Sequence, residues 1–368
     1  MFTIDTTLLH IIDAFDFKGE LTECIPFGSG HINSTFRLTF ENNKASSFYI
    51  LQQINTSIFK QPELLIENIS GVTQWLRKKI MENNGDPSRE TLTLIPTKNN
   101  MLYHIGEDGK FWRAYHFITH ASCYDQVEKP EDFYQSAVAF GKFQGLLSDY
   151  PAETLHETIP NFHNTVDRFQ KFLEVVKKDP VGRAASVQKE IQFVLEREAL
   201  AHKLCDLQES GKLPLRVTHN DTKLNNIMID DATGKAICVI DLDTVMPGLS
   251  VNDFGDSIRF GASTGAEDET DLDKIWCDLT LFEIYTKGFL EGCAGSLTEL
   301  ELDILPYGAI LMTFECGMRF LTDYLDGDHY FKIQREHHNL DRCRTQFKLV
   351  KDMEQKLPIM NEIVSKYR

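Results

Sequence analysis

The chain has 368 residues, of which 42% are hydrophobic and 25% charged, and its formal net charge at pH 7 is −17. This composition is typical of a folded globular protein and excludes collagen-like, coiled-coil and intrinsically disordered chains. Because so large an excess of carboxylates repels phosphate backbones and anionic lipid headgroups, we expect no nucleic-acid partner and no membrane partner.

Cysteine spacing and the amino-terminal segment bear on the cellular compartment. The eight cysteines lie at least 16 residues apart, so the sequence has no closely spaced pair of the kind that binds zinc or forms a redox disulfide. The first 17 residues lack the basic start of a signal peptide, and no segment approaches the roughly 20 apolar residues of a membrane helix. We therefore expect a cytoplasmic protein.

The first 118 residues predict a small β-rich lobe with one helix. A strand ending at Phe27 precedes two runs rich in aromatic and β-branched residues, 34–40 and 47–53, whose polar linker predicts a hairpin. Pro62 then begins an amphipathic helix, in which apolar residues recur three and four positions apart up to Ile80. Three further short strands are predicted at 91–95, 101–105 and 111–118.

From about residue 130 the apolar residues recur with a helical period. They predict helices over 130–147, 164–178, 187–208, 272–290, 298–325 and 340–366. One β-rich island, 214–241, interrupts these helices. The predicted fold class is therefore α+β, with a β-rich lobe at 1–118 and a mainly helical lobe at 119–368. Chemistry is expected at the island, since loops on a rigid scaffold tend to carry it.

The island contains residues whose spacing is typical of phosphoryl transfer. Residues 219–226 read HNDTKLNN, and Asp241 follows Asn226 by 15 residues, about one tight hairpin. In a kinase catalytic loop an Asp accepts the proton of the attacking hydroxyl, an Asn five residues later binds Mg²⁺, and an Asp beyond a hairpin binds the metal on the ATP phosphates. Asp221 is thus the candidate base, with Asn226 and Asp241 as candidate magnesium ligands. Lys223 is placed to neutralise charge on the phosphate.

Two alternative interpretations bear on this motif. The segments HND and IDLD would also suit surface turns capped by Asp and Asn, but an apolar strand precedes each of them. The sequence DFG at 253–255 spells the metal-binding motif of protein kinases, yet it follows Asn226 by 27 residues and no apolar strand leads into it. We therefore place the metal ligand at Asp241 and expect Asp253 and Asp256 to be structural supports.

A second candidate segment lies between the first two predicted strands. Residues 27–33 read FGSGHIN, at the place where kinases carry a glycine-rich loop over the phosphates. An ordinary hairpin turn is the alternative. His31 is either a solvated loop residue or a substrate contact, and Arg259 and Arg319 are either partners in structural ion pairs or anchors for substrate oxygens. The candidate nucleotide-binding residues in this segment are Gly28, Ser29, Gly30 and Asn33.

The motifs at 219–226 and 240–244 resemble those of the aminoglycoside phosphotransferase and choline kinase superfamily. Longer runs, among them GSGHINSTF, RVTHNDTKLNNIMID, VIDLDTVMPG and ECGMRFLTDYL, are similar to the N-acetylhexosamine 1-kinases in the same order, from about residue 20 to the end. The resemblance implies a bilobal protein-kinase-like fold, with a nucleotide-binding lobe at 1–118 and the catalytic loop and sugar site in 119–368. It also implies that ATP and Mg²⁺ are used to phosphorylate the anomeric hydroxyl of N-acetylglucosamine or N-acetylgalactosamine.

The same resemblance implies roles for individual residues. Asp221 is the catalytic base, and Asn226 and Asp241 hold Mg²⁺. The hinge that meets adenine is formed by His116, Phe117 and Ile118, and Lys223 belongs to the nucleotide-binding set. The sugar is contacted by His31, Asp221, Asp243, Phe260 and Arg319.

Some positions depart from protein kinases. The strand that bears their phosphate-binding lysine has Gln52 and Gln53 here, and Glu67 on the following helix has no lysine partner in the sequence. A non-catalytic, nucleotide-binding pseudokinase is thus one alternative, and a kinase of choline, homoserine, methylthioribose or an aminoglycoside is another. Asn220 replaces the Arg that precedes their catalytic Asp, which predicts activity without phosphorylation of a loop. We expect a monomer or small homo-oligomer whose partners are MgATP and a small-molecule sugar.

Overall fold

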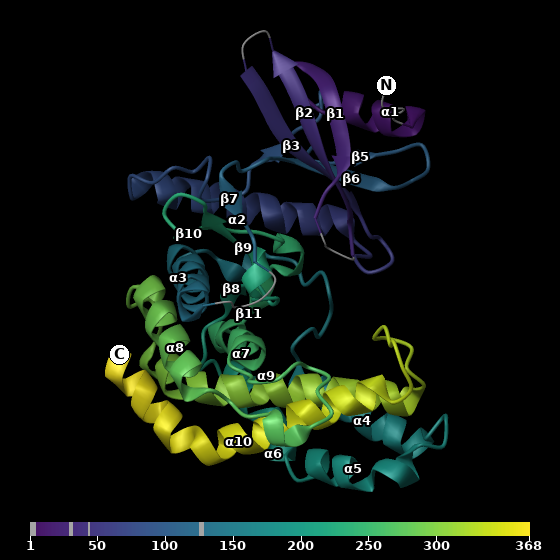
Figure 1. Cartoon of the computed structure of the whole chain (residues 1–368), viewed down its shortest axis with the longest axis vertical. Helices are drawn as coiled ribbons and strands as arrows, with labels where there is room; N and C mark the ends of the chain where they lie inside the picture. The colour runs from purple at the N-terminus through teal and green to yellow at the C-terminus, as the bar shows by residue number, and fades with distance from the viewer. Residues whose placement is uncertain (1–4, 29–31, 43–44, 125–128) are drawn as a thin grey trace. The chain divides into compact units, whose positions relative to one another are not determined.

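A computed structural model describes residues 5–28, 32–42, 45–124 and 129–368 (Figure 1). The chain forms two compact units. The first comprises Met1–Cys123, Thr154–Ile159 and Met228–Met246, and the second Tyr124–Glu153, Pro160–Ile227 and Pro247–Arg368. The first is built on a β-sheet and the second is mainly helical, so the predicted α+β class is confirmed. The division at residue 118 stays a prediction.

The first unit is built on an antiparallel sheet with the strand order β1-β2-β3-β6-β4, and β5 pairs with β6. Its buried face carries aliphatic and aromatic side chains such as Leu38, Leu51 and Trp112, which share one core with Ile11 and Ile12. The predicted strands at 91–95 and 101–105 are each reduced to two residues. The strands are β1 (Glu20–Pro26), β2 (Ser34–Asn42), β3 (Ala45–Ile54), β4 (Leu94–Ile95), β5 (His104–Ile105) and β6 (Phe111–His116).

Two helices accompany this sheet, where the sequence predicted one. α2 (Pro62–Glu82) is the predicted helix, with proline at its first position. α1 (Thr6–Ala14) was missed, because its nine residues are too few to show a clear helical period. Its amino terminus is capped by the side chain of Asp5, and its two isoleucines pack into the same core as the sheet.

The β-rich island at 214–241 divides between two small sheets. β9 (Ile227–Asp230) lies between β10 (Ala236–Val239) and β7 (Ala121–Ser122) in a three-stranded sheet. β8 (Arg216–Thr218) instead pairs with β11 (Met246–Gly248). The strand that leads into the HND motif is therefore not part of the hairpin that leads to Asp241.

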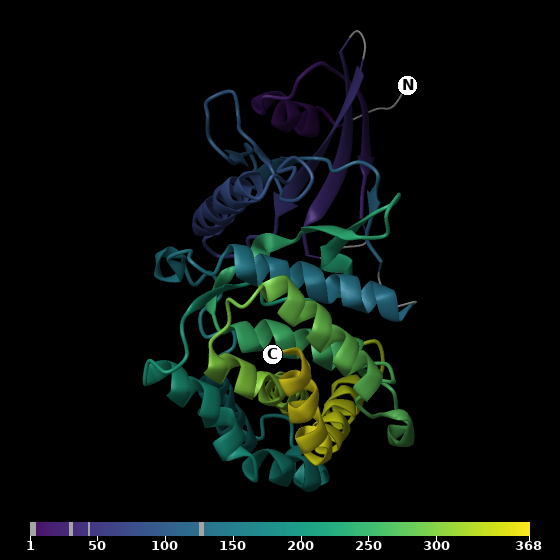
Figure 2. The ribbon, with the colours of Figure 1, turned by 90° about the vertical axis from the view of Figure 1, so that its left-hand side faces the viewer.

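The second unit consists mainly of helices (Figures 1 and 2). The predicted helix at 187–208 is broken at 196–197, and the one at 272–290 begins only at Leu279, where the side chain of Asp278 caps it. α7, directly after β11, was not predicted. The α-helices are α3 (Pro130–Leu146), α4 (Thr165–Lys178), α5 (Gln188–Leu195), α6 (Glu198–Glu209), α7 (Ser250–Gly261), α8 (Leu279–Cys293), α9 (Glu299–Asp326) and α10 (His338–Tyr367).

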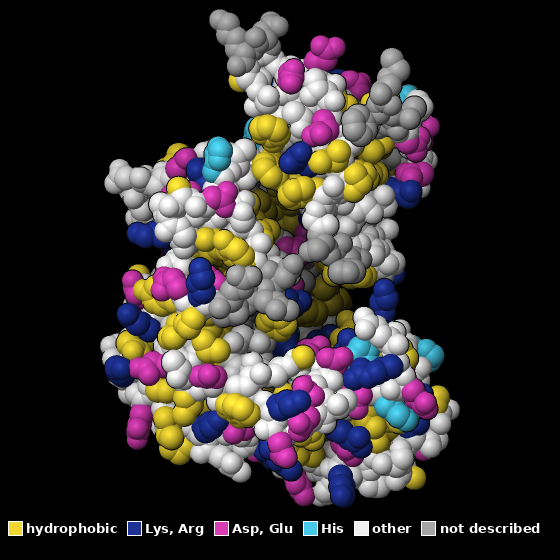
Figure 3. All heavy atoms as spheres, in the orientation of Figure 1, with side chains coloured by type: hydrophobic (Ala, Val, Ile, Leu, Met, Phe, Trp, Pro, Cys, Tyr) yellow, Lys and Arg dark blue, Asp and Glu magenta, His cyan; other side chains and the backbone are white. Residues whose placement is uncertain are grey.

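The core of the second unit is centred on α9, which contacts α4, α7 and α10, while α3 packs against α8. α7 and α9 approach so closely that a Cβ on Gly255 would lie 2.4 Å from the carbonyl oxygen of Gly308. The expectation that no segment has the character of a membrane helix is wrong for α9. By length and composition alone, this helix is long and apolar enough to cross a membrane. However, 83% of its most apolar window is buried, so its place in the core accounts for its composition. Acidic and basic side chains are interspersed over the face of this unit drawn in Figure 3.

Candidate active site

The catalytic-loop motif lies directly after β8 in the second unit. Asn220 adopts a left-handed backbone conformation with φ of +63°, which Asn tolerates better than most residues. The 3₁₀ turn Leu224–Asn226 follows and returns the chain to β9. Asp221 thus lies in a short irregular segment between the strands β8 and β9, as the motif predicts.

The carboxylate of Asp253, on α7, holds this loop in place through hydrogen bonds. It accepts hydrogen bonds from the backbone N–H of His219 and of Asn220, both at 2.8 Å, and from the side-chain amide of Gln144 at 2.8 Å. The Thr222 hydroxyl donates to the backbone carbonyl of Asp253 at 2.7 Å. With 1% of its surface exposed, Asp253 is a structural support of the loop, so that prediction is confirmed.

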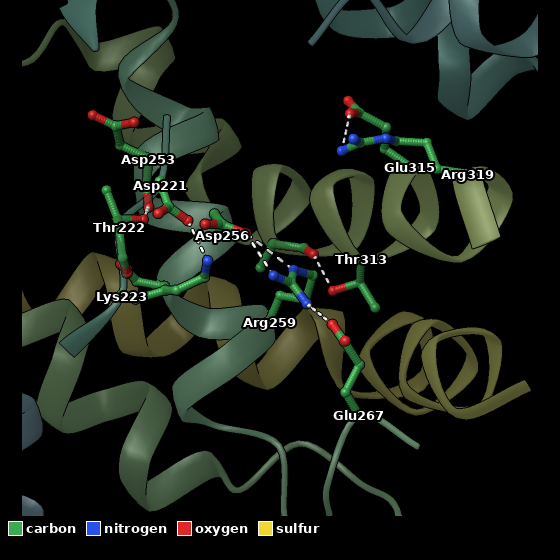
Figure 4. Close-up of polar contacts among 12 residues, drawn as sticks. Asp221, Thr222, Lys223, Asp253, Asp256, Arg259, Glu267, Thr313, Glu315 and Arg319 are labelled. Atoms are coloured by element: carbon green, nitrogen blue, oxygen red, sulfur yellow. Dashed lines mark hydrogen bonds and ion pairs between the residues drawn. The ribbon is translucent and has the colours of Figure 1, made fainter. Parts of the chain in front are cut away.

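Asp221 lies between two polar side chains of its own loop, of which Figure 4 shows Lys223. Lys223 Nζ is 2.6 Å from Asp221 Oδ1, and Asn226 Nδ2 donates to Asp221 Oδ2 at 3.1 Å and to its backbone carbonyl at 2.8 Å. Burial lowers the pKa of Lys223, but its charge interaction and hydrogen bond with Asp221, aided by Asp256, leave the pKa above its usual value. Lys223 is therefore a cation at neutral pH, and it orients one oxygen of the candidate base.

A row of alternating charges continues from Lys223 along α7 (Figure 4). Burial raises the pKa of Asp256, but Arg259 and Lys223 outweigh this effect and bring it below its usual value. Arg259 binds Asp256 at 2.9 Å and Glu267 at 3.0 Å and is 9% exposed. The structure therefore favours the structural ion pair for Arg259, one of the two interpretations left open by the sequence. Phe260, which follows it, is 42% exposed.

Arg319, on α9, lies among aromatic rings. Its guanidinium is 5.9 Å from the ring centroid of Phe162, 5.6 Å from that of Tyr330 and 5.5 Å from that of Phe331. Its Nη2 donates to the Tyr330 hydroxyl at 3.3 Å, and its Nη1 lies 3.9 Å from Glu315. We call Phe162, Arg319, Tyr330 and Phe331 the Arg319 cage.

Two carboxylates support the Arg319 cage from inside the protein. Burial raises the pKa of Glu315, but His163 and Arg319 outweigh it, so the pKa lies below its usual value and Glu315 stays ionised. Asp323 accepts hydrogen bonds from three backbone N–H groups of the loop that carries Tyr330 and Phe331, two of the three cage aromatics: His329 at 2.9 Å, Tyr330 at 2.8 Å and Phe331 at 2.9 Å. The cage is therefore built on a fixed loop.

In the first unit, two nucleotide-binding candidates lie close together. The rings of Phe27 and Phe117 contact each other at 5.5 Å, and Phe48 lies 6.3 Å from Phe117. The segment 116–118, which begins at the last residue of β6, thus lies beside the start of the glycine-rich segment. Gly28 has φ of +83°, which favours glycine. Ser29, Gly30 and His31 lie outside the described residues.

Asp241 and Asp243 lie in the first unit with very different surroundings. Asp241 is exposed and has a left-handed backbone with φ of +56°. Asp243 is only 4% exposed: Arg113 Nη1 lies 2.5 Å from its Oδ1, and Asn33 Nδ2 donates to its Oδ2 at 2.6 Å. Both oxygens of Asp243 are thus held by protein groups, and its proposed contact with the sugar stays a prediction. Sequence reasoning missed Arg113, whose partner lies 130 positions further along the chain.

The donor types at Asn226 and Asp241 fit Mg²⁺, which prefers oxygen ligands and often takes only one or two from the protein, the rest coming from phosphates and water. Asn226 is fixed through its amide nitrogen, which leaves its carbonyl oxygen as the donor for a cation. Among the described residues, no group of three or more His, Cys, Asp or Glu side chains could by itself hold a metal ion.

Solved structures share this fold across nearly the whole chain. An aminoglycoside phosphotransferase from Alicyclobacillus acidocaldarius has a TM-score of 0.58 at 12% identity, covering 100% of this chain and 98% of that one. A spectinomycin phosphotransferase in complex with ADP and spectinomycin has a TM-score of 0.53 at 13% identity, covering 95% and 98%. A choline kinase from Cryptosporidium parvum has a TM-score of 0.52 at 12% identity, covering 92% and 90%.

These likenesses show the bilobal fold of kinase-like phosphotransferases, which was the predicted fold. The family itself is shown by the sequence, because the model of the phosphotransferase enzyme family matches residues 23–280, more than two thirds of the chain. The match includes the catalytic loop, the hairpin after it and Asp241. The chain belongs to the phosphotransferase enzyme family.

Proposed function

We propose that the protein transfers the γ-phosphoryl group of ATP to the anomeric hydroxyl of an N-acetylhexosamine, giving the sugar 1-phosphate and ADP. The observation that carries the phosphoryl-transfer chemistry is the catalytic loop, in which the Asp221 carboxylate is held between Lys223 and Asn226. The choice of sugar rests on the sequence runs that resemble N-acetylhexosamine 1-kinases and on the ion pairs of the second unit that lie near the catalytic loop and Arg319.

In the proposed reaction Asp221 acts as the general base. It accepts the proton of the sugar hydroxyl while the oxygen forms a bond to the γ-phosphorus, and the bond from that phosphorus to the β,γ-bridging oxygen breaks to release ADP. Lys223 fixes Asp221 Oδ1 and places a positive charge beside the phosphoryl group. Magnesium, when bound through Asn226 and Asp241, would neutralise charge on the phosphate oxygens.

We assign nucleotide recognition to the first unit. Phe27 and Phe117 offer an apolar surface that suits a purine ring, and we place the hinge that meets adenine at 116–118. Gly28 begins the segment that we propose to lie over the phosphates. Asn33 ends that segment, and its side-chain carbonyl oxygen accepts a hydrogen bond from the backbone N–H of Asn55 at 3.0 Å, which ties the end of the segment to the residue that follows β3.

The charges of the second unit favour a neutral acceptor over a cationic one. Lys223, Arg259 and Arg319 each lie beside a carboxylate, so the charges of Asp221, Asp256 and Glu315 are already compensated. An acceptor that carries amines would have to compete with these fixed cations. The Arg319 cage combines apolar ring faces with guanidinium donors, a combination that suits a sugar with hydroxyl and acetamido groups.

The second candidate function is a kinase of a cationic alcohol. Two proteins of similar structure are named for such acceptors, spectinomycin and choline. A panel assay separates it from our proposal: ADP release from MgATP is measured with N-acetylglucosamine, N-acetylgalactosamine, choline, homoserine, methylthioribose and an aminoglycoside. We expect turnover with one or both N-acetylhexosamines. Faster turnover with a cationic acceptor would reject the assigned substrate, and no ADP with any acceptor would favour the pseudokinase.

A matched pair of variants tests the role of Asp221. D221N keeps the shape of the side chain but removes the base, so we expect kcat to fall about 100-fold or more. D206N makes the same change on α6 at an exposed position and should leave kcat unchanged. Nearly full turnover by D221N would show that Asp221 is not the base. The cytoplasmic location and the oligomeric state stay predictions.

A further inference from the structure

The first unit lacks a lysine at the strand position where kinases bind phosphate, and the structure shows what occupies that place. Gln52, on β3, lies directly opposite Thr35 on β2 and Arg113 on β6. Its amide nitrogen donates to the Thr35 hydroxyl at 3.0 Å, and its carbonyl oxygen accepts from Arg113 Nε at 3.1 Å and Nη2 at 3.0 Å. A polar row thus crosses three strands on one face of the sheet.

Arg113 is the buried cation of this row. It is 1% exposed, and its third nitrogen, Nη1, forms the 2.5 Å ion pair with Asp243. A lysine at position 52 would place a like charge directly opposite Arg113, which destabilises a strand pair. Gln52 is therefore a neutral partner that suits Arg113, and the cation of this polar row lies on β6, the strand beside β3.

Asp243 connects Arg113 to the segment that carries the candidate metal ligand. It lies two residues after Asp241, in the 3₁₀ turn Leu242–Thr244. Three residues of the segment 241–245 have a defined backbone conformation or defined contacts. Asp241 is held in a left-handed conformation, Asp243 binds Arg113 and Asn33, and the carbonyl oxygen of Val245 accepts from Asn68 Nδ2 at 3.0 Å.

Helix α2 is attached to this segment without the usual ion pair. Asn68 is 2% exposed, and besides Val245 it binds the backbone of His156 in both directions, at 2.8 Å each. Glu67, beside it, pairs with the His156 ring at 2.7 Å. An amide on α2 and a guanidinium on β6 therefore hold the segment 241–245, whereas protein kinases join the corresponding strand and helix by a lysine–glutamate ion pair.

We propose that Arg113 is a positioning residue that replaces the absent lysine: by binding Asp243 and Gln52 it fixes the segment 241–245, so that Asp241 is presented to the metal–nucleotide complex. The proposal rests on the proposed use of MgATP. It does not require Arg113 to touch the nucleotide, because all three of its guanidinium nitrogens are directed to Gln52 and Asp243. Its predicted effect is on the part of nucleotide affinity that depends on Mg²⁺.

The test measures ADP binding calorimetrically, with Mg²⁺ and with EDTA, for variants that remain folded by circular dichroism. R113Q leaves the buried Asp243 without its cation and is therefore at risk of not folding. The double variant R113Q/D243N removes both charges and is used for the measurement if R113Q does not fold. A third variant, Q52K/R113Q, returns a positive charge to β3. The control, R197Q/E354Q, removes a two-bonded ion pair of the second unit with distances of 2.9 and 2.8 Å.

For the wild-type chain we expect Mg²⁺ to tighten ADP binding. In R113Q/D243N that gain should fall at least tenfold while the affinity in EDTA changes little, since loss of a group that orients a metal ligand typically costs about 10- to 100-fold in metal affinity. Q52K/R113Q should recover part of the gain, and the control should keep all of it. An unchanged magnesium gain in folded R113Q/D243N would overturn the proposal.

The two proposals fail in different ways. If the wild-type chain binds ADP but phosphorylates no acceptor, the proposed function is wrong, and the magnesium gain of the variants still decides the role of Arg113. If the wild-type chain phosphorylates a sugar and R113Q/D243N keeps its magnesium gain, only the role of Arg113 is wrong. If the wild-type chain binds no ADP in either buffer, both are rejected.

Discussion

Replacing Asp253 by asparagine tests whether the α7 carboxylate holds the catalytic loop in its working geometry. Asp253 Oδ2 accepts two hydrogen bonds, from His219 N–H and Gln144, and Oδ1 accepts one, from Asn220 N–H. An asparagine amide keeps the two bonds at Oδ2 if its oxygen occupies that position. Its NH₂ group then faces the N–H of Asn220, so one buried donor loses its acceptor.

The expected magnitude follows from that single loss. A hydrogen bond to a charged acceptor contributes about 1.5–3 kcal/mol, so D253N should lower the free energy of unfolding by about 2 kcal/mol. Asn220 immediately precedes Asp221, and a displacement of the base by about 1 Å can cost up to about 100-fold in rate. We therefore expect kcat to fall about 10- to 100-fold, with little change in KM for ATP.

Urea unfolding and steady-state kinetics on the same preparation check both numbers. Q144L is the graded comparison, because it removes one donor from the carboxylate and leaves both loop N–H bonds in place. It should cost less stability and keep most of the activity. If folded D253N had the kcat of the wild-type chain, the assignment of Asp253 as the support of the base would be refuted.

Three further predictions concern other parts of the second unit. D323N removes part of the carboxylate that fixes the loop of the Arg319 cage, so KM for the acceptor should rise about tenfold with kcat nearly unchanged; a fall in kcat alone would argue against the cage as the acceptor site. Burial raises the pKa of Glu301, but its hydrogen bonds with Arg216 and other partners outweigh this and hold it below the ordinary value of 4.5. The Arg216–Glu301 pair therefore stabilises the fold above pH 4.5, and that stability is lost as the pH falls through the lower pKa that Glu301 has in the folded state. We expect E301Q to lower the free energy of unfolding in urea by about 3 kcal/mol at pH 7 and by clearly less near pH 3. An equal loss at both pH values would contradict the pairing. G255A should destabilise the chain by about 1–3 kcal/mol, because its methyl would meet the Gly308 carbonyl, and unchanged thermal unfolding would show that α7 and α9 have room to move apart.

The catalytic loop could be predicted from the sequence because its chemistry is local. Asp221, Lys223 and Asn226 lie within six residues, and their mutual contacts follow from one tight turn. The long helices were equally clear, since a buried helix such as α9 repeats its apolar positions over 28 residues. The helix break at 196–197 was hidden, because apolar spacing continues on both sides of it.

The features that were missed depend on pairing across the chain. The opposition of Gln52 and Arg113 follows from the register of β3 and β6, and 61 positions separate them. Neither helical nor strand periodicity contains that information. α1 was missed for a different reason: two turns are too short for a periodic signal, and the helix is stabilised by packing on the sheet and by the Asp5 cap. The consequence was that the absent lysine was visible in the sequence, but its substitute was not.

The central claim is that the product is a sugar phosphorylated at its anomeric oxygen. The most direct measurement is a ³¹P NMR spectrum of the purified protein with ATP, Mg²⁺ and either N-acetylglucosamine or N-acetylgalactosamine, reading the coupling of any new monoester signal. We predict a doublet whose phosphorus couples to the anomeric proton, absent with D221N. A monoester coupled to other sugar protons, or no sugar phosphate with either acceptor while ATP remains intact, would contradict the claim.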